Sequence, residues 1–356
     1  MRNAFRAFGA ISFVLVAAGC GDDAASPNAN PDGGGSPDGS TSNPDASPIP
    51  NTKSPVIAGC AILPPDHPLN SDISQMPVHK SSATFIQSIG ANTALHPDWG
   101  TFAEQYGIPI NTGTGAAPVA FQWTTKWGPN ESDKLPCSGT GGNFCYPIPT
   151  TAKIEGGPAA KTTADRHVLY LDTKGAPSAC TLYEIYNTQN FTAAPWLAAN
   201  GAIFPMNTNA LRPDGWTSAD AAGLPILPLL VRYDEVKAGK IEHALRVTVD
   251  ASFQGFIHPA THAAGDANAS LPPMGLRLRL KPGVNPAGAS PEAQVIIAAM
   301  KKYGLIVADN GSGWYIQGDT HDGWTPIIDG IISAFGKIHG SDFEAVDTGP
   351  TIPQPN

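Results

Sequence analysis

The sequence predicts a mainly β fold, a two-sheet sandwich or jelly roll with a few peripheral helices. Glycine and proline are abundant, with 38 and 35 of the 356 residues, which favours turns and short strands over long helices. Several short segments alternate apolar and polar residues with the period of a strand, and the clearest are 117–126, 166–172, 180–187 and 276–281. Segment 290–303 has the most complete helix signature.

Two of these strands contain charged side chains whose environment the sequence leaves open. The TKGAPSA segment joins strands 166–172 and 180–187 and predicts a hairpin. Glu184 lies in the middle of the second strand, so it either pairs with an arginine in the core or faces a cleft. In strand 276–281, three leucines alternate with three cations, which we place on a solvated outer face; a groove that binds anions is the alternative.

Three helices are expected. In 290–303, Ser290 is the N-cap, Pro291 follows it, two lysines lie near the end and Gly304 lies just beyond. A second helix is expected at 81–89. A short third helix begins at Thr217 or Ser218 and ends at Ala222, with Asp220 near its positive end.

The first 19 residues have a basic start, an apolar stretch from Phe8 to Val16, and small residues before Cys20. They resemble a bacterial lipoprotein signal peptide with its lipobox, although Ala17 stands where leucine is commoner. The resemblance implies cleavage before Cys20, acylation of this cysteine, and export to the outer membrane or cell surface. The alternative is a transmembrane helix, but the stretch is shorter than the ~20 residues that span a bilayer.

The remaining chain divides by composition. Residues 20–55 are rich in Ser, Pro, Gly, Asn and Asp, and they predict a disordered tether because they contain too few large apolar residues to fold. Residues 56–347 predict a single β-rich domain. Residues 348–356 are a short tail that is expected to fray.

Four cysteines remain after Cys20, an even number that suits disulfides in an oxidising compartment. Three pairings are possible. We expect Cys137–Cys145 to close a local loop and Cys60–Cys180 to tie the N-terminal segment to a central strand. Free buried thiols are the alternative.

Charge and motifs exclude several functions. The formal charge is −9, and removing Arg2 and Arg6 with the leader would make it −11, so neither nucleic acid nor an anionic lipid surface is an expected partner. GxSxG, HExxH, GxxxxGK[ST] and Gly-rich βαβ motifs are missing from the sequence. His258 and His262 have the spacing of helical metal ligands, but Pro259 argues against a helix there. We therefore predict no metal, no cofactor, and a monomer anchored to the membrane by lipid only.

The strongest functional signal is the set of carboxylates near aromatic residues in and around 214–250. Glycoside hydrolysis needs one carboxylic acid and a second carboxylate, usually among aromatic rings that stack on sugars. Asp220 and Glu235 are the predicted catalytic pair, with Glu184 and Asp309 in reserve. The predicted substrate-binding residues are Trp216, Tyr233, Trp314, Arg246 and His258. The partner would then be a polysaccharide.

Three alternatives stay open. A polysaccharide lyase would use a His or Tyr base and an arginine that neutralises a uronate, for which the candidates are Arg246, His243, His258 and Arg277. A lipoprotein that binds glycans or another surface without catalysis is the second. In the third, arginines 232 and 246 form core ion pairs with the carboxylates of residues 220 and 235, and these groups are purely structural.

Several long strings in the body are distinctive: GWTSADAAGLPI, VRYDEV, HALRVTV, LPPMGLRLRLK and YGLIVADNG. They resemble a set of exported bacterial proteins without an assigned activity, and the resemblance covers residues 60–347. It implies a single compact exported unit and transfers no catalytic residue.

Overall fold

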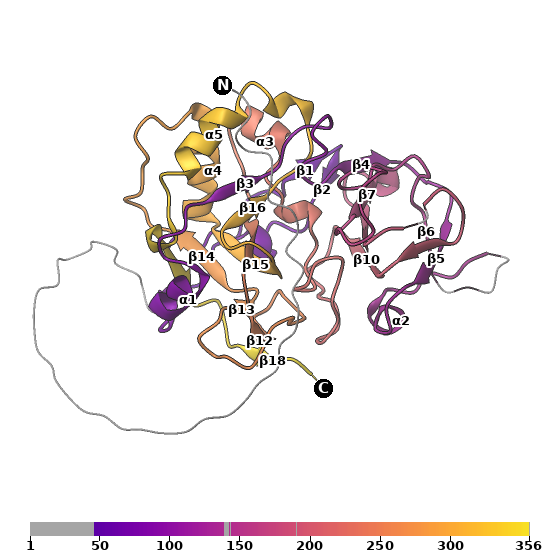
Figure 1. Ribbon diagram of the computed structural model, residues 1–356, viewed down its shortest axis with the longest axis horizontal. Coiled ribbons are helices and arrows are strands. Elements are labelled where there is room, and N and C mark those ends of the chain that lie inside the picture. Colours follow the sequence, from indigo (N-terminus) through magenta and orange to yellow (C-terminus); the bar gives the residue numbers. More distant parts are fainter. Residues whose placement is uncertain (1–45, 139–141, 143, 190, 356) are drawn as a thin grey trace, which may run out of the picture. The chain divides into compact units, whose positions relative to one another are not determined.

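The computed structural model describes residues 46–138, 142, 144–189 and 191–355 (Figure 1). The predicted signal peptide and lipidation site at Cys20 lie outside these residues. The predicted class is confirmed: the fold is mainly β, sandwich-like, with strands in several sheets and few helices. Among the described residues, no helix combines the length and apolar character that crossing a bilayer requires.

The largest sheet has six strands in the order β17-β14-β15-β11-β16-β3. Their bounds are β3 His96–Asp98, β11 Leu245–Val249, β14 Arg277–Leu280, β15 Leu305–Asn310, β16 Tyr315–Gln317 and β17 Phe343–Val346. The central strands β11 and β15 are parallel, whereas β14 runs antiparallel to β15 and β17. All five residues of β11 are buried, because this sheet is covered on both faces.

A second sheet has four strands in the order β10-β8-β7-β4. They are β4 Ile110–Gly113, β7 Val168–Asp172, β8 Thr181–Tyr186 and β10 Asn200–Pro205. The predicted hairpin is confirmed, because β7 and β8 pair antiparallel with Tyr170 opposite Tyr183.

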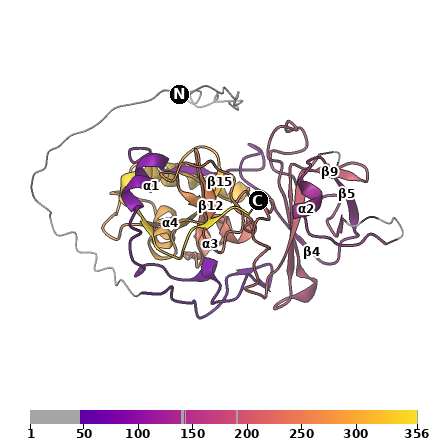
Figure 2. The same cartoon turned by 90° about the horizontal axis from the view of Figure 1, so that it is seen from below.

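Three small sheets complete the strand pairing. The first contains β1 Val56–Ile57 and β2 Cys60–Ala61; the second contains β12 Phe253–Phe256, β13 Pro273–Met274 and β18 Ile352–Pro353. The third contains β5 Val119–Trp123, β6 Cys145–Tyr146 and β9 Trp196–Ala198. Figure 2 shows β5 and β9 side by side, as their parallel pairing requires.

The helices are short. They are α1 Ser82–Ile89, α2 Gly128–Glu131, α3 Tyr233–Ala238, α4 Pro291–Lys302 and α5 Ile328–Phe335, and the 3-10 helices are η1 Pro68–Asn70, η2 Thr173–Gly175, η3 Leu227–Leu229, η4 Asp322–Trp324 and η5 Gly340–Asp342. α4 contacts both α3 and α5 (Figure 1). The predicted cap of α4 is confirmed, because Ser290 Oγ accepts a hydrogen bond from Ala293 N at 3.2 Å.

Both expected disulfides are present, Cys60–Cys180 and Cys137–Cys145. The first joins β2 to the start of β8 across 120 residues, so it links the N-terminal segment to the four-stranded sheet. Disulfides persist in oxidising compartments, and the pair therefore indicates an extracytoplasmic location.

The cations of β14 correct one expectation. Arg277 and Arg279 are 2% and 3% exposed, not solvated. Arg277 donates to the carbonyls of Pro68 and Tyr303, and Arg279 pairs with Glu344 at 2.6 Å while donating to three further carbonyls. The reason is that the segment before α1 covers this face of the sheet, and its irregular backbone needs donors.

Both predicted boundaries of the body also need correction. Asn51 lies in the predicted tether, yet its amide donates to Glu242 O at 2.8 Å and accepts from the Tyr303 hydroxyl at 2.8 Å. The predicted tail contains β18, in which Ile352 pairs with Phe256 of β12. Backbone and side-chain hydrogen bonds therefore hold both segments on the body.

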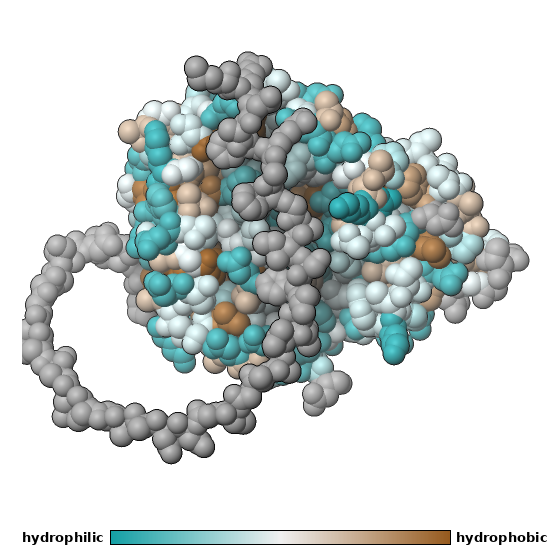
Figure 3. Space-filling view, viewed as in Figure 1, coloured by the Kyte–Doolittle hydropathy of each residue, from teal (hydrophilic) through white to brown (hydrophobic). Residues whose placement is uncertain are grey.

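The outer surface is mixed in character. On the face drawn in Figure 3, apolar residues form small separate spots among polar ones. A large continuous apolar patch would mark a protein or membrane contact surface. The described part of this face has no such patch.

Candidate functional site

A cavity of about 470 Å³ lies between segments that are far apart in the sequence. Its lining residues are Trp127, Glu131, Asp165, Tyr186, Thr217, Ser218, Ala219, Asp220, Ala221, His262, Ala264, Asp309 and Asn310. Four of them are carboxylates, and none is a lysine or arginine. Two of the predicted catalytic residues, Asp220 and Asp309, therefore line the same cavity.

Arg246 connects these two carboxylates. Its Nη2 lies 2.7 Å from Asp220 Oδ1 and 3.9 Å from Asp309 Oδ2, so the separation of the two oxygens cannot exceed the sum of these distances. Its Nη1 donates to Gln317 Oε1 on the neighbouring strand β16. Arg246 and Asp220 are fully buried, whereas the Asp309 side chain is 28% exposed. Of the two carboxylates, Asp220 and Asp309, only Asp309 is open to a ligand in the cavity.

The segment that carries Asp220 is a turn, which corrects the expected helix at 217–222. Ser218 Oγ accepts from Asp220 N at 2.9 Å and donates to Leu224 O at 2.6 Å. Such bonds from a serine side chain to the local backbone compete with helix formation. The turn brings the Asp220 carboxylate to Arg246.

Burial raises the pKa of both carboxyl groups, and the charge of Asp220 further raises the pKa of Asp309. Arg246 opposes this effect in both cases, but the pKa of Asp309 still rises to about 7. A carboxylic acid with this pKa can be protonated near neutral pH. Asp309 therefore has the acidity expected of a general acid.

Three further side chains line the cavity, a histidine and two aromatic residues. His262 Nδ1 lies 2.7 Å from the carbonyl oxygen of Ala221, which can only accept, so Nδ1 carries a proton. Tyr186 at the end of β8 is half-buried, and burial raises the pKa of its hydroxyl to about 12. Trp127 lies at 36% exposure and presents a ring to the same cavity.

Glu184, a predicted reserve catalytic residue, neither pairs with an arginine in the core nor faces a cleft. Its carboxylate accepts hydrogen bonds from the backbone N–H groups of Ile226 and Leu227 at 2.9 to 3.0 Å. Burial raises its pKa to about 7. It is fully buried and holds the start of η3 against β8.

The predicted partner of Asp220 lies elsewhere. Glu235 is in the first turn of α3. It pairs with Arg232 at 2.7 Å and His243 at 2.9 Å. Carboxylates are favoured at a helix N-terminus, and Gly239 ends the helix in a left-handed conformation. The structure thus does not bring Glu235 together with Asp220.

Four of the predicted substrate-binding residues also lie outside the lining of this cavity. Trp314 is fully buried and donates to Gly90 O, while Tyr233 stacks on His321 at 4.2 Å. His258 pairs with Asp214 on the surface at 2.8 Å. Trp216 packs near Arg212, whose guanidinium carbon lies 5.7 Å from the ring centroid.

The fifth, Arg246, is at the site but is engaged with Asp220 and Gln317. The sequence reasoning missed Asp165, His167, Glu131 and Trp127. The string ADRHVLYLD did offer a signal, because three charged or titratable residues stand directly before a wholly buried strand. Among the described residues, no group of three or more potential ligands could hold a metal ion.

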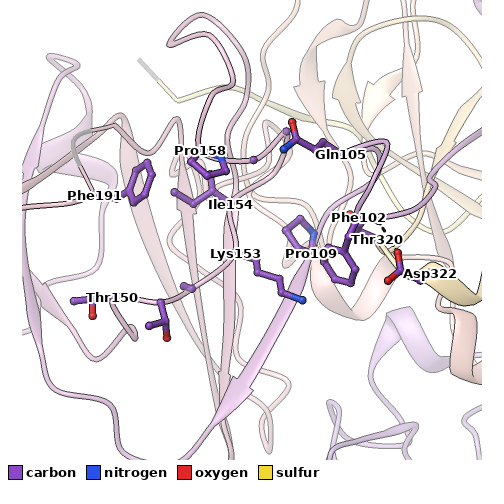
Figure 4. Close-up of a pocket in the computed structure, with 14 residues that line it drawn as sticks. Phe102, Gln105, Pro109, Thr150, Lys153, Ile154, Pro158, Phe191, Thr320 and Asp322 are labelled. Atoms are coloured by element: carbon purple, nitrogen blue, oxygen red, sulfur yellow. Dashed lines mark hydrogen bonds between the residues drawn. The ribbon is translucent and has the colours of Figure 1, made fainter.

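A second cavity, of about 590 Å³, is more apolar (Figure 4). Phe102, Pro109, Ile154 and Phe191 are among its lining residues, and Lys153 Nζ lies 3.5 Å from the Phe102 ring centroid. Among its described lining residues the one carboxylate belongs to Asp322, which accepts from Phe102 N. Without a second acid, this cavity suits binding better than acid–base chemistry.

Comparisons with known proteins add no constraint on the activity. No protein-family model matches the chain, and neither a curated protein nor a solved structure matches it. The chemistry of the cavity is therefore the basis for assigning a function.

Proposed function

We propose that the chain is an exported, lipid-anchored glycoside hydrolase that acts on a polysaccharide at the cavity containing Asp309. The observation that carries this proposal is the partly exposed Asp309, whose pKa is raised to about 7 beside the buried Asp220–Arg246 pair. Asp309 serves as the general acid and gives its proton to the leaving glycosidic oxygen.

Asp165 is the second carboxylate in this proposal. It lines the same cavity, is exposed, and makes no ion pair within 4 Å among the described residues. Its charge is close enough to contribute to the raised pKa of Asp309. Burial raises the pKa of Asp165, and the positive charges of His167 and Arg246 oppose this rise. In its ionised form the carboxylate acts as the nucleophile or as the base that activates water.

Asp220 takes a different role from the one expected of it. A side chain with no exposed surface does not reach a substrate, so Asp220 is a positioning residue. It holds Arg246 and, through its own charge, raises the pKa of Asp309.

The lining of the cavity favours a neutral glycan over a uronate. Its described lining residues include four carboxylates and no lysine or arginine, so an anionic sugar would be repelled. Arg246 is not free to neutralise a uronate because it is buried and bonded to Asp220. Trp127 and Tyr186 supply the aromatic surface on which sugar rings stack.

The test compares Asp309→Asn with the wild type on soluble neutral β-glucans, xylans, mannans and α-glucans, with release of reducing ends as the readout. Loss of a general acid lowers the rate by roughly 10²–10⁴-fold. Asp329→Asn, a change at an exposed carboxylate on α5, is the matched control and should leave the rate unchanged.

A substrate that the wild type and Asp309→Asn cleave equally fast would refute this role for Asp309. Binding of a polysaccharide by the wild type without release of reducing ends would instead support a non-catalytic glycan-binding protein. The anchor is tested separately with Cys20→Ala, which should remove incorporated fatty acid and release the chain from the membrane fraction.

A further inference from the structure

His167 lies next to the proposed site, directly before β7, and is fully enclosed by protein. Its Nδ1 is 2.7 Å from Glu155 Oε2, and its Nε2 is 3.0 Å from the carbonyl oxygen of Ala219. Ala219 is the residue before Asp220. The imidazole ring therefore holds, by one hydrogen bond, the turn that delivers Asp220 to Arg246.

These contacts fix where the protons are. A carbonyl oxygen can only accept, so Nε2 must carry a proton. The bond between Nδ1 and the Glu155 carboxylate also needs a proton, and this proton lies on the histidine if the pair is ionic. Burial lowers the pKa of His167, but the charge and hydrogen bond of Glu155 outweigh it and raise the pKa to about 9, which supports the imidazolium form.

The imidazolium has several charged neighbours. The groups that face it or interact with it electrostatically are Glu155, Asp165, Glu184, Asp220, Arg246 and Asp309, and the Tyr186 ring lies 5.5 Å away. Most of them are acids, and Arg246 is the one other cation in this set. A fixed positive charge among so many carboxylates favours their ionised forms.

We propose that His167 is a positioning residue of the site: as an imidazolium held by Glu155, it orients the Ala219–Asp220 turn and favours the ionised form of Asp309. This inference rests on the proposed function for its catalytic meaning. Its test is independent of any substrate, so it can fail or succeed while the proposed activity is still unknown.

The first measurement is the pKa of Asp309, followed by carboxyl ¹³C NMR and assigned by the signal that Asp309→Asn removes. In His167→Gln the side chain is neutral but keeps an amide donor for the Ala219 carbonyl. Removing the nearby positive charge should raise the pKa of Asp309 by roughly half a unit or more. If the reaction is found, the alkaline limb of the pH–rate profile should move in the same direction.

The chain offers a matched control in His243. This histidine is also buried between a carbonyl oxygen, that of Ala244 at 2.7 Å, and a carboxylate, that of Glu235 at 2.9 Å. It lies beside α3 and is not among the residues that line the cavity. His243→Gln should destabilise the fold in the same way and leave the pKa of Asp309 unchanged.

An unchanged pKa of Asp309 in His167→Gln overturns the proposal, and so does an equal shift in His243→Gln. If His167→Gln does not fold, ¹⁵N NMR of the wild-type imidazole decides the question. Protonation of both ring nitrogens of His167 at pH 8 supports the proposal, and a neutral ring at that pH overturns it.

Discussion

Arg246 is the side chain on which both carboxylates of the site depend, and its removal should be the most damaging single change there. It is buried with Asp220, to which it is bonded at 2.7 Å, and both are completely enclosed. Arg246→Met leaves the Asp220 carboxylate buried without its cation. Breaking a buried ion pair in this way costs about 3–5 kcal/mol of unfolding free energy.

The assay is urea denaturation of Arg246→Met, Asp220→Ala and the double variant. Because the two side chains touch, their effects should not add, and the double variant should be more stable than the sum of the single losses predicts by about 0.5–3 kcal/mol. Additive losses would mean that the pair contributes no coupling, which would refute the ion-pair interpretation.

The penalty should also depend on pH. The folded-state pKa of Asp220 is already raised by burial, and loss of Arg246 removes the charge that opposes this rise. A carboxyl group with a raised folded-state pKa binds protons more tightly in the folded chain, so its contribution to stability is lost as pH rises. Arg246→Met should therefore be destabilised more at pH 8 than at pH 5, and an equal loss at both would contradict the argument.

Two further predictions use groups outside the cavity. Burial raises the pKa of Glu184 to about 7, so its contribution to stability is full below about pH 4 and is lost as pH rises toward 7. Over this pH range the unfolding free energy of Glu184→Gln should therefore fall less than that of the wild type. Parallel pH profiles for the two proteins would contradict this. Replacing Cys60 and Cys180 by alanine should cost more stability in thermal unfolding than replacing Cys137 and Cys145. The sequence separations are 120 and 8 residues, and a disulfide that closes a longer loop removes more entropy from the unfolded chain. The reverse order of stability losses would contradict this explanation.

Local signals in the sequence were sufficient for several elements. Ser290 and Pro291 marked the start of α4, and the two disulfides followed from the compartment and from the spacing of four cysteines. Each of these inferences needs only neighbouring residues or a small number of possible pairings. The mainly β class followed in the same way from abundant turn residues and alternating strands.

Long-range contacts determine the environment of residues whose local sequence pattern is compatible with more than one structure. Arg277 and Arg279 alternate with leucines like residues on a solvated face, but a segment some 200 positions away covers them. Glu235 was predicted to act together with Asp220, yet it lies in α3, which Gly239 and the helix dipole favour. In both cases the local pattern was compatible with two environments, and packing selected one.

Only part of the site could be predicted from the sequence, because its residues come from two different sheets. Arg246 comes from the six-stranded sheet, whereas His167 stands directly before a strand of the four-stranded sheet. The two cations act on the same pair of carboxylates, and their sequence positions do not suggest that they meet. The density of acids in the sequence could point to Asp220 and Asp309, but their acidity depends on cations supplied by separate sheets. A substitution that shifts one sheet relative to the other should therefore alter the pKa of Asp309 even when the substituted residue makes no contact with Asp309.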